Sequence, residues 1–221
     1  MTNPLPHHPV TTAAERRGRL ALLGLALGLA PMPLLAADGT ITITGEITSQ
    51  TCKINGAEPP ANLLVTLPRI STTALKNTND VAGATAFQIK LTDCPATLDN
   101  KNLKAYFEPG GTVDPATHNL IAYTTTSPPT TAASAIPSTG VGASDTFQSV
   151  QIQLTNPDGT IIKAGAPLAE QAVQDVKASK AAGASTADAT LTYLARYVRT
   201  SSNAITPGKL HAYVQYSIVY P

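Results

Sequence analysis

The chain has 221 residues, and its 15 Lys and Arg residues nearly balance its 14 Asp and Glu residues, which leaves a net charge of +1. Charged residues make up only 13% of the chain, so no basic patch favours nucleic-acid binding, and no acidic tail is present. Low charge, no Trp and many Thr, Ala, Ser and Gly residues are typical of a sheet-rich extracellular protein with a modest core.

Residues 1–37 have the pattern of a secretory signal peptide, in which a basic segment precedes a short apolar core and small residues. The basic segment is residues 16–19, and the apolar run of residues 20–30 is too short to span a bilayer as a helix. This length argues against the alternative of a membrane anchor. We expect cleavage after Ala36 or Ala37. Export by the general secretory route is favoured, because only the arginine pair of a twin-arginine motif is present.

The mature chain would open on a β-strand over residues 38–51. Ile41, Ile43 and Ile47 alternate with Thr and Glu side chains, as expected of a strand with one apolar and one polar face. Gly45 falls on the apolar face. A terminal strand frays unless it is docked in a sheet, so the sequence raises the question of where this strand docks.

Cys52 and Cys94 are the only cysteines. After export both would lie in an oxidising compartment, where such a pair normally forms a disulfide. In a chain-entropy treatment the bond contributes about 4 kcal/mol of stability. A redox pair is more often spaced C-x-x-C, and a zinc site needs more ligands. We therefore favour a structural bridge and expect no metal and no cofactor.

Between the cysteines, the patterns predict a turn at 55–56, a short strand at 63–67, a loop at 71–83 and a strand at 86–94. In this last strand Phe87, Ile89 and Leu91 share one face, whereas Cys94 has the opposite parity. A bulge or the strand end must therefore turn Cys94 if it points into the core.

Beyond Cys94, alternation and turn residues predict strands at 102–108, 120–123, 147–154, 161–162, 190–198 and 210–220. The Thr/Ala/Ser/Pro/Gly-rich stretch 124–145 is expected to be a long loop, and 156–159 a turn. Residues 167–182 repeat an apolar position every four residues, which predicts a short helix or, nearly as well, a surface loop. Many short strands separated by turns indicate an all-β sandwich, with no second domain.

One face of the last predicted strand is formed by Val214, Tyr216, Ile218 and Tyr220. No turn and no further strand follow before Pro221, so we expect this strand to leave an apolar edge open. An open apolar edge favours aggregation. Either the strand at 38–51 covers it within the same molecule, or another molecule does.

Five ordered pieces of the mature chain resemble the major subunits of type 1-like fimbriae, which the chaperone–usher pathway assembles. The pieces are DGTITITGEITSQTC, FQIKLTDC, SVQIQLTNPDGT, LARYVRTSSNAITPG and AYVQYSIVYP. Their order, the cysteine separation and the leader carry the resemblance, which covers nearly the whole mature chain. Residues 164–186 depart from it, because they are longer and richer in Ala and Lys than the family pattern.

The resemblance implies an incomplete immunoglobulin-like β-sandwich that lacks its last strand and is completed by a donor strand from a partner. The expected organisation is a signal peptide at 1–37, a donor-strand extension at 38–51 and a pilin domain at 52–221. A periplasmic chaperone would fill the gap first. The next subunit's extension would replace it at the outer-membrane usher, which builds a head-to-tail fimbria at the cell surface that supports adhesion.

The resemblance also assigns residues to the two sides of this contact. The donor face implied by the family pattern consists of Gly39, Ile41, Ile43, Gly45 and Ile47. The implied acceptor edge, which also forms a zipper with the chaperone, consists of Val214, Tyr216, Ile218, Tyr220 and Pro221. Gly45 would sit where the groove of the neighbouring subunit is shallow, and the carboxylate of Pro221 would meet a basic cleft in the chaperone.

Other functions fit the sequence less well. The mature chain has only His118 and His211, and no G-x-S-x-G or H-E-x-x-H motif, so we expect no enzyme. A tip adhesin would carry a lectin domain before the pilin domain, and a terminator would lack a donor strand. Two alternatives stay open: a minor adaptor subunit of the same pilus, and a self-contained secreted β-sandwich binding module whose first strand folds back.

Overall fold

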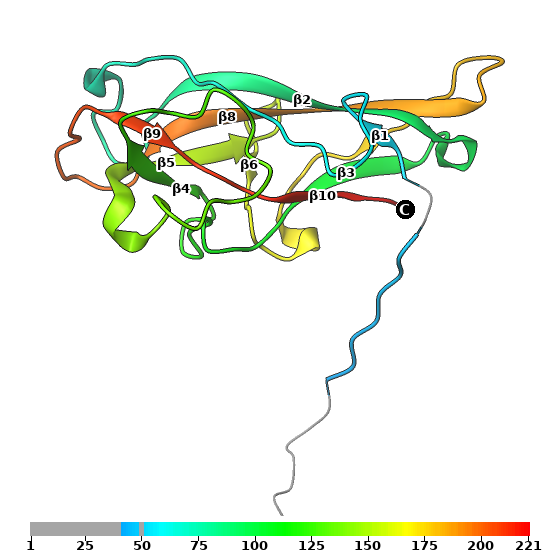
Figure 1. Ribbon diagram of the computed structural model, residues 1–221, viewed down its shortest axis with the longest axis horizontal. Coiled ribbons are helices and arrows are strands. Elements are labelled where there is room, and N and C mark those ends of the chain that lie inside the picture. Colours follow the sequence, from blue (N-terminus) through cyan, green and yellow to red (C-terminus); the bar gives the residue numbers. More distant parts are fainter. Residues whose placement is uncertain (1–40, 49–50) are drawn as a thin grey trace, which may run out of the picture. The chain divides into compact units, whose positions relative to one another are not determined.

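The computed structural model describes residues 41–48 and 51–221 (Figure 1). The predicted signal peptide and Gly39 lie outside the described residues. The chain divides into two units, residues 1–46 and 47–221. Residues 41–48 contain no assigned strand or helix, and every strand of the described residues begins at Lys53 or later. No helix in the described part of the chain is long and apolar enough to cross a membrane.

The second unit contains two antiparallel sheets. The strands of the larger sheet, in spatial order, are β1 (Lys53–Ile54), β2 (Val81–Pro95), β8 (Thr186–Arg199), β5 (Thr146–Thr155), β4 (Leu120–Thr125) and β9 (Lys209–His211). A further strand, β6 (Ile161–Ile162), pairs with β5. The smaller sheet consists of β10 (Tyr216–Val219), β3 (Asn102–Phe107) and β7 (Val176–Lys177). Four single-turn 3₁₀ helices lie in the loops: η1 (Thr72–Ala74), η2 (Ala96–Leu98), η3 (Ala143–Asp145) and η4 (Leu168–Glu170).

The two sheets share one hydrophobic core. In β3 the side chains of Leu103, Ala105 and Phe107 are buried, whereas the intervening positions are more accessible, as expected of a strand with one inward face. Tyr193 of β8 lies against them: its ring meets that of Phe107 edge-on at 5.4 Å, and its hydroxyl accepts a hydrogen bond from the Ala105 N–H. This contact between the sheets confirms the all-β sandwich expected from the sequence.

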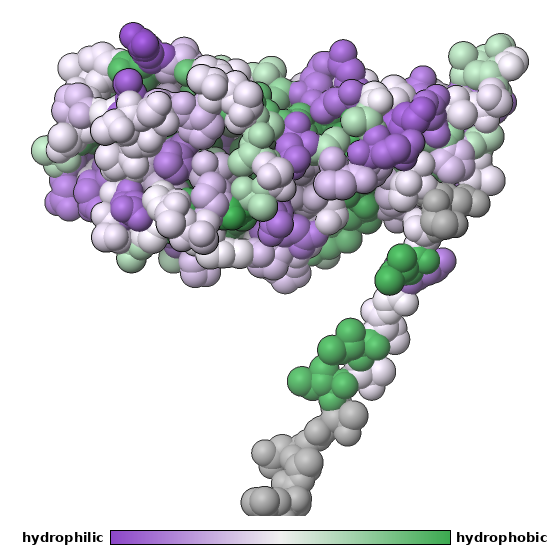
Figure 2. Space-filling view, viewed as in Figure 1, coloured by the Kyte–Doolittle hydropathy of each residue, from purple (hydrophilic) through white to green (hydrophobic). Residues whose placement is uncertain are grey.

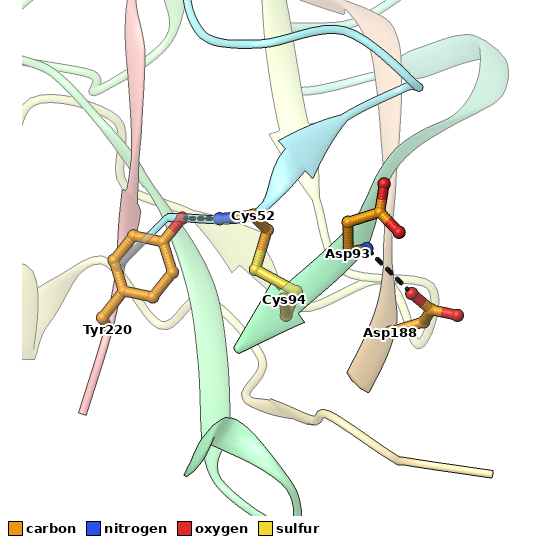
Figure 3. The surroundings of a disulfide bond; sticks show 5 residues. All are labelled: Cys52, Asp93, Cys94, Asp188 and Tyr220. Atoms are coloured by element: carbon orange, nitrogen blue, oxygen red, sulfur yellow. Dashed lines mark hydrogen bonds between the residues drawn. A yellow bond between two sulfur atoms is a disulfide. The ribbon is translucent and has the colours of Figure 1, made fainter. Parts of the chain in front are cut away.

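An irregularity in the pairing of β2 with β8 turns Cys94 into the core. The sequence predicted such a bulge, because Cys94 has the opposite parity to the inward-facing residues of its strand. The register of β2 against β8 shifts between Leu91 and Cys94, and Asp93 adopts a positive φ of 51°. The Asp93 N–H, freed from the ladder, donates to the Asp188 carboxylate at 3.2 Å (Figure 3). Cys94 is fully buried as a result and forms a disulfide with Cys52, so both expectations for this residue are confirmed.

The strand predicted at 38–51 is not assigned in its described residues 41–48, and three further predicted elements differ from the structure. Residues 63–67 form no hydrogen-bonded strand. The last strand is divided, because β9 pairs with β4 of the larger sheet, whereas β10 pairs with β3 of the smaller one. Residues 167–182 form neither a helix of several turns nor a plain surface loop. They contain η4, the fully buried Gln171 and β7, whereas the repeated positions Leu168 and Ala172 are exposed, so the four-residue repeat does not mark an inward face.

Candidate assembly edge

The smaller sheet has an edge strand at β10. Within residues 51–221, β10 pairs only with β3, in a register that places Tyr216 opposite Phe107 and Ile218 opposite Ala105 (Figure 1). Of the residues that join β9 to β10, Gln215 accepts a hydrogen bond from the Glu108 N–H at 2.9 Å, whereas no backbone–backbone hydrogen bond is found for residues 212–214 within this range. One side of the last part of the chain therefore presents main-chain groups that an added strand could pair with.

The segment 58–70, which we call the wall segment, is likewise without a ladder. None of its backbone groups takes part in a backbone–backbone hydrogen bond within residues 51–221. Its side chains nevertheless alternate strictly between half-buried and exposed from position 61 to 67. The alternation is that of a strand packed on a core, and what the segment lacks is a hydrogen-bonded neighbour.

Two rows of half-buried apolar side chains result, and both pack against the common core. The first row, from the wall segment, consists of Ala61, Leu63, Val65 and Leu67. The second row, from the end of the chain, consists of Ala212, Val214, Tyr216, Ile218 and Tyr220. The predicted acceptor residues thus lie together, although only Tyr216 and Ile218 belong to β10, and Pro221 follows as an exposed terminal residue.

Hydrogen bonds place the two rows near each other. The Tyr216 hydroxyl donates to the Ala61 carbonyl at 2.6 Å. The Tyr220 hydroxyl accepts from the Cys52 N–H at 3.1 Å, beside the disulfide (Figure 3). Burial raises the pKa of Tyr216, so its hydroxyl stays protonated and able to donate at all physiological pH values. Both contacts run from side chains of the last residues to the backbone of the first part of the domain.

The predicted donor residues that the structure describes are highly accessible. Ile41 and Ile43 are each 89% exposed and Ile47 is 100% exposed. Figure 2 shows them as hydrophobic groups on an extended stretch of chain. A Cβ added at Gly45 would meet no atom within 4 Å. Large apolar side chains with this exposure are typical of a surface that a partner covers.

Sequence reasoning missed one side of this site. The alternation at 63–67 predicted a strand, but nothing in it indicated that the strand would have no ladder partner or would face the second row. Tyr197 was also missed, and its hydroxyl donates to the Pro68 carbonyl at 3.2 Å, at the far end of the wall segment. Within the described residues, no group of three or more His, Cys, Asp or Glu side chains could hold a metal ion.

Comparison with known proteins gives consistent matches. Residues 67–221 match the family described as FimA, type-1 fimbrial protein A. The chain is 42% identical over 210 residues to fimbrial protein FimX of Bordetella pertussis, over 90% of this chain and 97% of that protein. It is 40% identical over 208 residues to the serotype 3 fimbrial subunit of the same organism, over 89% of this chain and 94% of that one. The crystal structure of the P pilus rod subunit PapA superimposes with a TM-score of 0.48 at 15% identity, over 77% of this chain and 99% of that one.

Proposed function

We propose that this chain, which belongs to the FimA family of type-1 fimbrial proteins, is built into its fimbria by lending its N-terminal strand to the next copy of itself. The chain is a structural subunit of a pilus. In the proposed contact, residues 38–51 of one subunit pair with the edge of the next, between its wall segment and β10. The face formed by Gly39, Ile41, Ile43, Gly45 and Ile47 would turn toward the two rows.

One observation carries this proposal: an accessible row of isoleucines and an unladdered apolar edge occur in the same chain. Ile41, Ile43 and Ile47 have the sequence parity of one strand face, and their side chains are almost fully exposed. Burial of these three side chains would contribute roughly 5–9 kcal/mol. Each main-chain hydrogen bond of the new ladder would add about 1 kcal/mol.

The geometry of such a contact favours a filament. Strand addition to a sheet edge is a common way for an extended segment to bind a folded domain. Here the donor and the acceptor are different surfaces of the same chain, so the contact is head-to-tail and need not close into a ring. Each added subunit presents a new free extension, and growth can therefore continue.

An unfilled edge is a hazard before assembly, because an open apolar strand edge promotes aggregation. We propose that residues 1–37 direct export and are removed, and that a periplasmic chaperone then covers the edge. Val214, Tyr216, Ile218 and Tyr220 would form the zipper with the chaperone, and the exposed Pro221 carboxylate would meet its basic cleft. An outer-membrane usher would exchange the chaperone for the next donor strand, which delivers the fimbria to the cell surface to support adhesion.

Moving the donor strand tests the proposal. The variant lacks residues 38–51 at its N-terminus and carries them after Pro221 through a short linker. We expect a stable monomer, because the strand now fills its own edge, whereas the mature chain without a chaperone aggregates or forms filaments. Analytical ultracentrifugation and urea unfolding measure both properties. A matched control carries the same segment with Ile41, Ile43 and Ile47 changed to Ser, and it should behave like the chain without a donor.

The alternative of a self-contained sandwich makes the opposite prediction. If residues 38–51 can be deleted outright and the remaining chain is a stable, reversible monomer without a chaperone, then no edge needs to be filled. That result would overturn the proposed strand exchange while leaving the membership in the fimbrial family untouched.

A further inference from the structure

We propose that three tyrosine hydroxyl groups, those of Tyr197, Tyr216 and Tyr220, act as struts that hold the chain from Cys52 to Pro68 in position to receive the incoming strand. This inference rests on the proposed strand exchange, and it assigns positioning roles that the apolar rows alone do not require. The acceptor site then consists of the two apolar rows and of three hydrogen bonds from tyrosine hydroxyls to the backbone.

The need for struts follows from the missing ladder. A strand inside a sheet is held by main-chain hydrogen bonds to its neighbours, but the wall segment has none within residues 51–221. Its apolar side chains face the core, and hydrophobic contacts are not directional. Apolar contacts therefore leave the segment free to slide and turn, whereas a directional hydrogen bond at each end restricts both motions.

Each of the three hydroxyls makes a hydrogen bond to the backbone of this stretch, and these bonds restrict its sliding and turning. Tyr220 accepts from the Cys52 N–H at 3.1 Å, Tyr216 donates to the Ala61 carbonyl at 2.6 Å, and Tyr197 donates to the Pro68 carbonyl at 3.2 Å. The contacts of Tyr216 and Tyr197 fall within the wall segment, and that of Tyr220 falls ahead of it, at Cys52, beside the disulfide and β1. Two of them come from the last residues of the chain, so they also set the distance between the two rows.

The Tyr197 ring lies in a closely packed site, and this packing places its hydroxyl beside the Pro68 carbonyl. Gly83 has a positive φ of 68°, and a Cβ added there would lie 3.0 Å from the Tyr197 ring and 3.3 Å from the Pro68 side chain. Glycine at position 83 therefore leaves room for the ring beside Pro68. Burial also raises the pKa of Tyr197, which keeps this hydroxyl protonated as a donor.

Removing a single oxygen tests the struts. Tyr216→Phe, Tyr197→Phe and Tyr220→Phe each delete one hydroxyl from the full mature chain and keep the ring. Tyr106→Phe is the matched control, because the Tyr106 hydroxyl on the neighbouring β3 makes no hydrogen bond within the described residues. Tryptic cleavage after Arg69, an exposed residue of the wall segment, is followed by mass spectrometry in dilute, freshly refolded, oxidised subunit. Filament formation is followed by light scattering at higher concentration.

We expect Tyr216→Phe to speed cleavage after Arg69 by about three- to tenfold, because a loosened segment opens to the protease more often, with no change in cleavage after Arg196 of β8. Filaments should form several-fold more slowly, because a loosened edge must be ordered during docking. Completed filaments should resist denaturant as the wild type does, since the docked strand then supplies the missing ladder. This separation of assembly rate from filament stability would not follow from a general loss of fold stability.

Several outcomes would overturn the proposal. Cleavage after Arg69 at the same rate as in Tyr106→Phe would show that the hydroxyl does not hold the segment. Faster cleavage with an unchanged assembly rate would remove the positioning role, and faster assembly would make the bond an obstacle to docking. If Tyr216→Phe does not fold, Tyr197→Phe and Tyr220→Phe decide by the same criteria. If the wild type forms no filaments, the proposed strand exchange fails, while the cleavage rate after Arg69 still tests the struts.

Discussion

Gln171 shows how a single polar side chain can complete a β-sheet. It is fully buried, and its Oε1 atom accepts from the Phe107 N–H at 3.0 Å. Its Nε2 atom donates to the carbonyls of Phe107 and Ala166 at 2.7 and 3.1 Å. The side-chain amide thus pairs with the end of β3 as the backbone of another strand would. A buried polar group is stable only when it is satisfied in this way.

Replacing this amide should be costly. Gln171→Leu is close in size but leaves the Phe107 N–H and the Ala166 carbonyl without their partner. Each buried polar group without a partner costs about 1–3 kcal/mol, so urea unfolding should show a loss of that order for each group. The control is Gln174→Ala, whose side chain is exposed and should change stability by less than about 0.5 kcal/mol. Equal stabilities for the two variants would contradict this role of Gln171.

At the scale of elements, two described segments have the side-chain alternation of strands but no assigned strand. One is residues 41–48, whose isoleucines are exposed, and the other is the wall segment, whose inward row is half-buried. The isoleucines of residues 41–48 form an apolar row that packs on no core within the described residues. The wall segment packs on the core, but its backbone has no hydrogen-bonded neighbouring strand within residues 51–221. Each supplies what the other lacks, which is the physical basis of the proposed exchange.

A substitution at Gly45, in the proposed donor strand, can test assembly without disturbing the fold of the subunit. A side chain at this position would meet nothing in the subunit, so Gly45→Leu should fold and secrete normally. If Gly45 enters a shallow part of the neighbour's groove, the same change should block filament formation, because overpacking a filled site is unfavourable. Electron microscopy of cells that express the variant provides the measurement. Thr44→Leu, on the opposite face, is the control and should form normal filaments, and normal filaments from Gly45→Leu would refute the assigned position.

At the scale of the whole molecule, the disulfide joins the first part of the domain to the end of β2. Cys52 and Cys94 are 42 residues apart in sequence and are both fully buried. The bond therefore ties the entry of the wall segment to the larger sheet. Tyr220 meets the Cys52 N–H on the other side, so both ends of the domain converge on this bridge (Figure 3).

Loss of the bridge should lower global stability. For Cys52→Ser combined with Cys94→Ser, we expect the free energy of unfolding to fall by about 4 kcal/mol, because the unfolded chain regains the freedom of a closed loop. Urea unfolding measures this change, and the reduced wild type should match the double variant. Alkylation of the exported wild type followed by mass measurement should detect no free thiol. An unchanged urea midpoint in the double variant would show that the bridge is not a stabilising element.

Much of the fold could be predicted because β-strand alternation is a local property. Period-two patterns located β3 and β5 closely, and the parity of Cys94 against Phe87, Ile89 and Leu91 required the bulge that the structure has. The long Thr- and Ser-rich stretch at 124–145 is a loop apart from Thr124 and Thr125 of β4 at one end and η3 at the other. The connection at 164–186 was not predicted, because the role of Gln171 depends on a strand 64 residues away.

The sequence by itself determined the all-β class, the disulfide pair and the two apolar faces at the ends of the mature chain. It could do so because side-chain alternation, cysteine number and leader composition are written in neighbouring residues. Only the tertiary structure decided that the wall segment has no ladder, that the last strand is shared between two sheets, and that three tyrosine hydroxyls bond to the backbone of Cys52, Ala61 and Pro68. These features depend on which backbone groups find partners across long sequence separations, and a hydrogen bond between distant residues leaves no periodic trace in the chain.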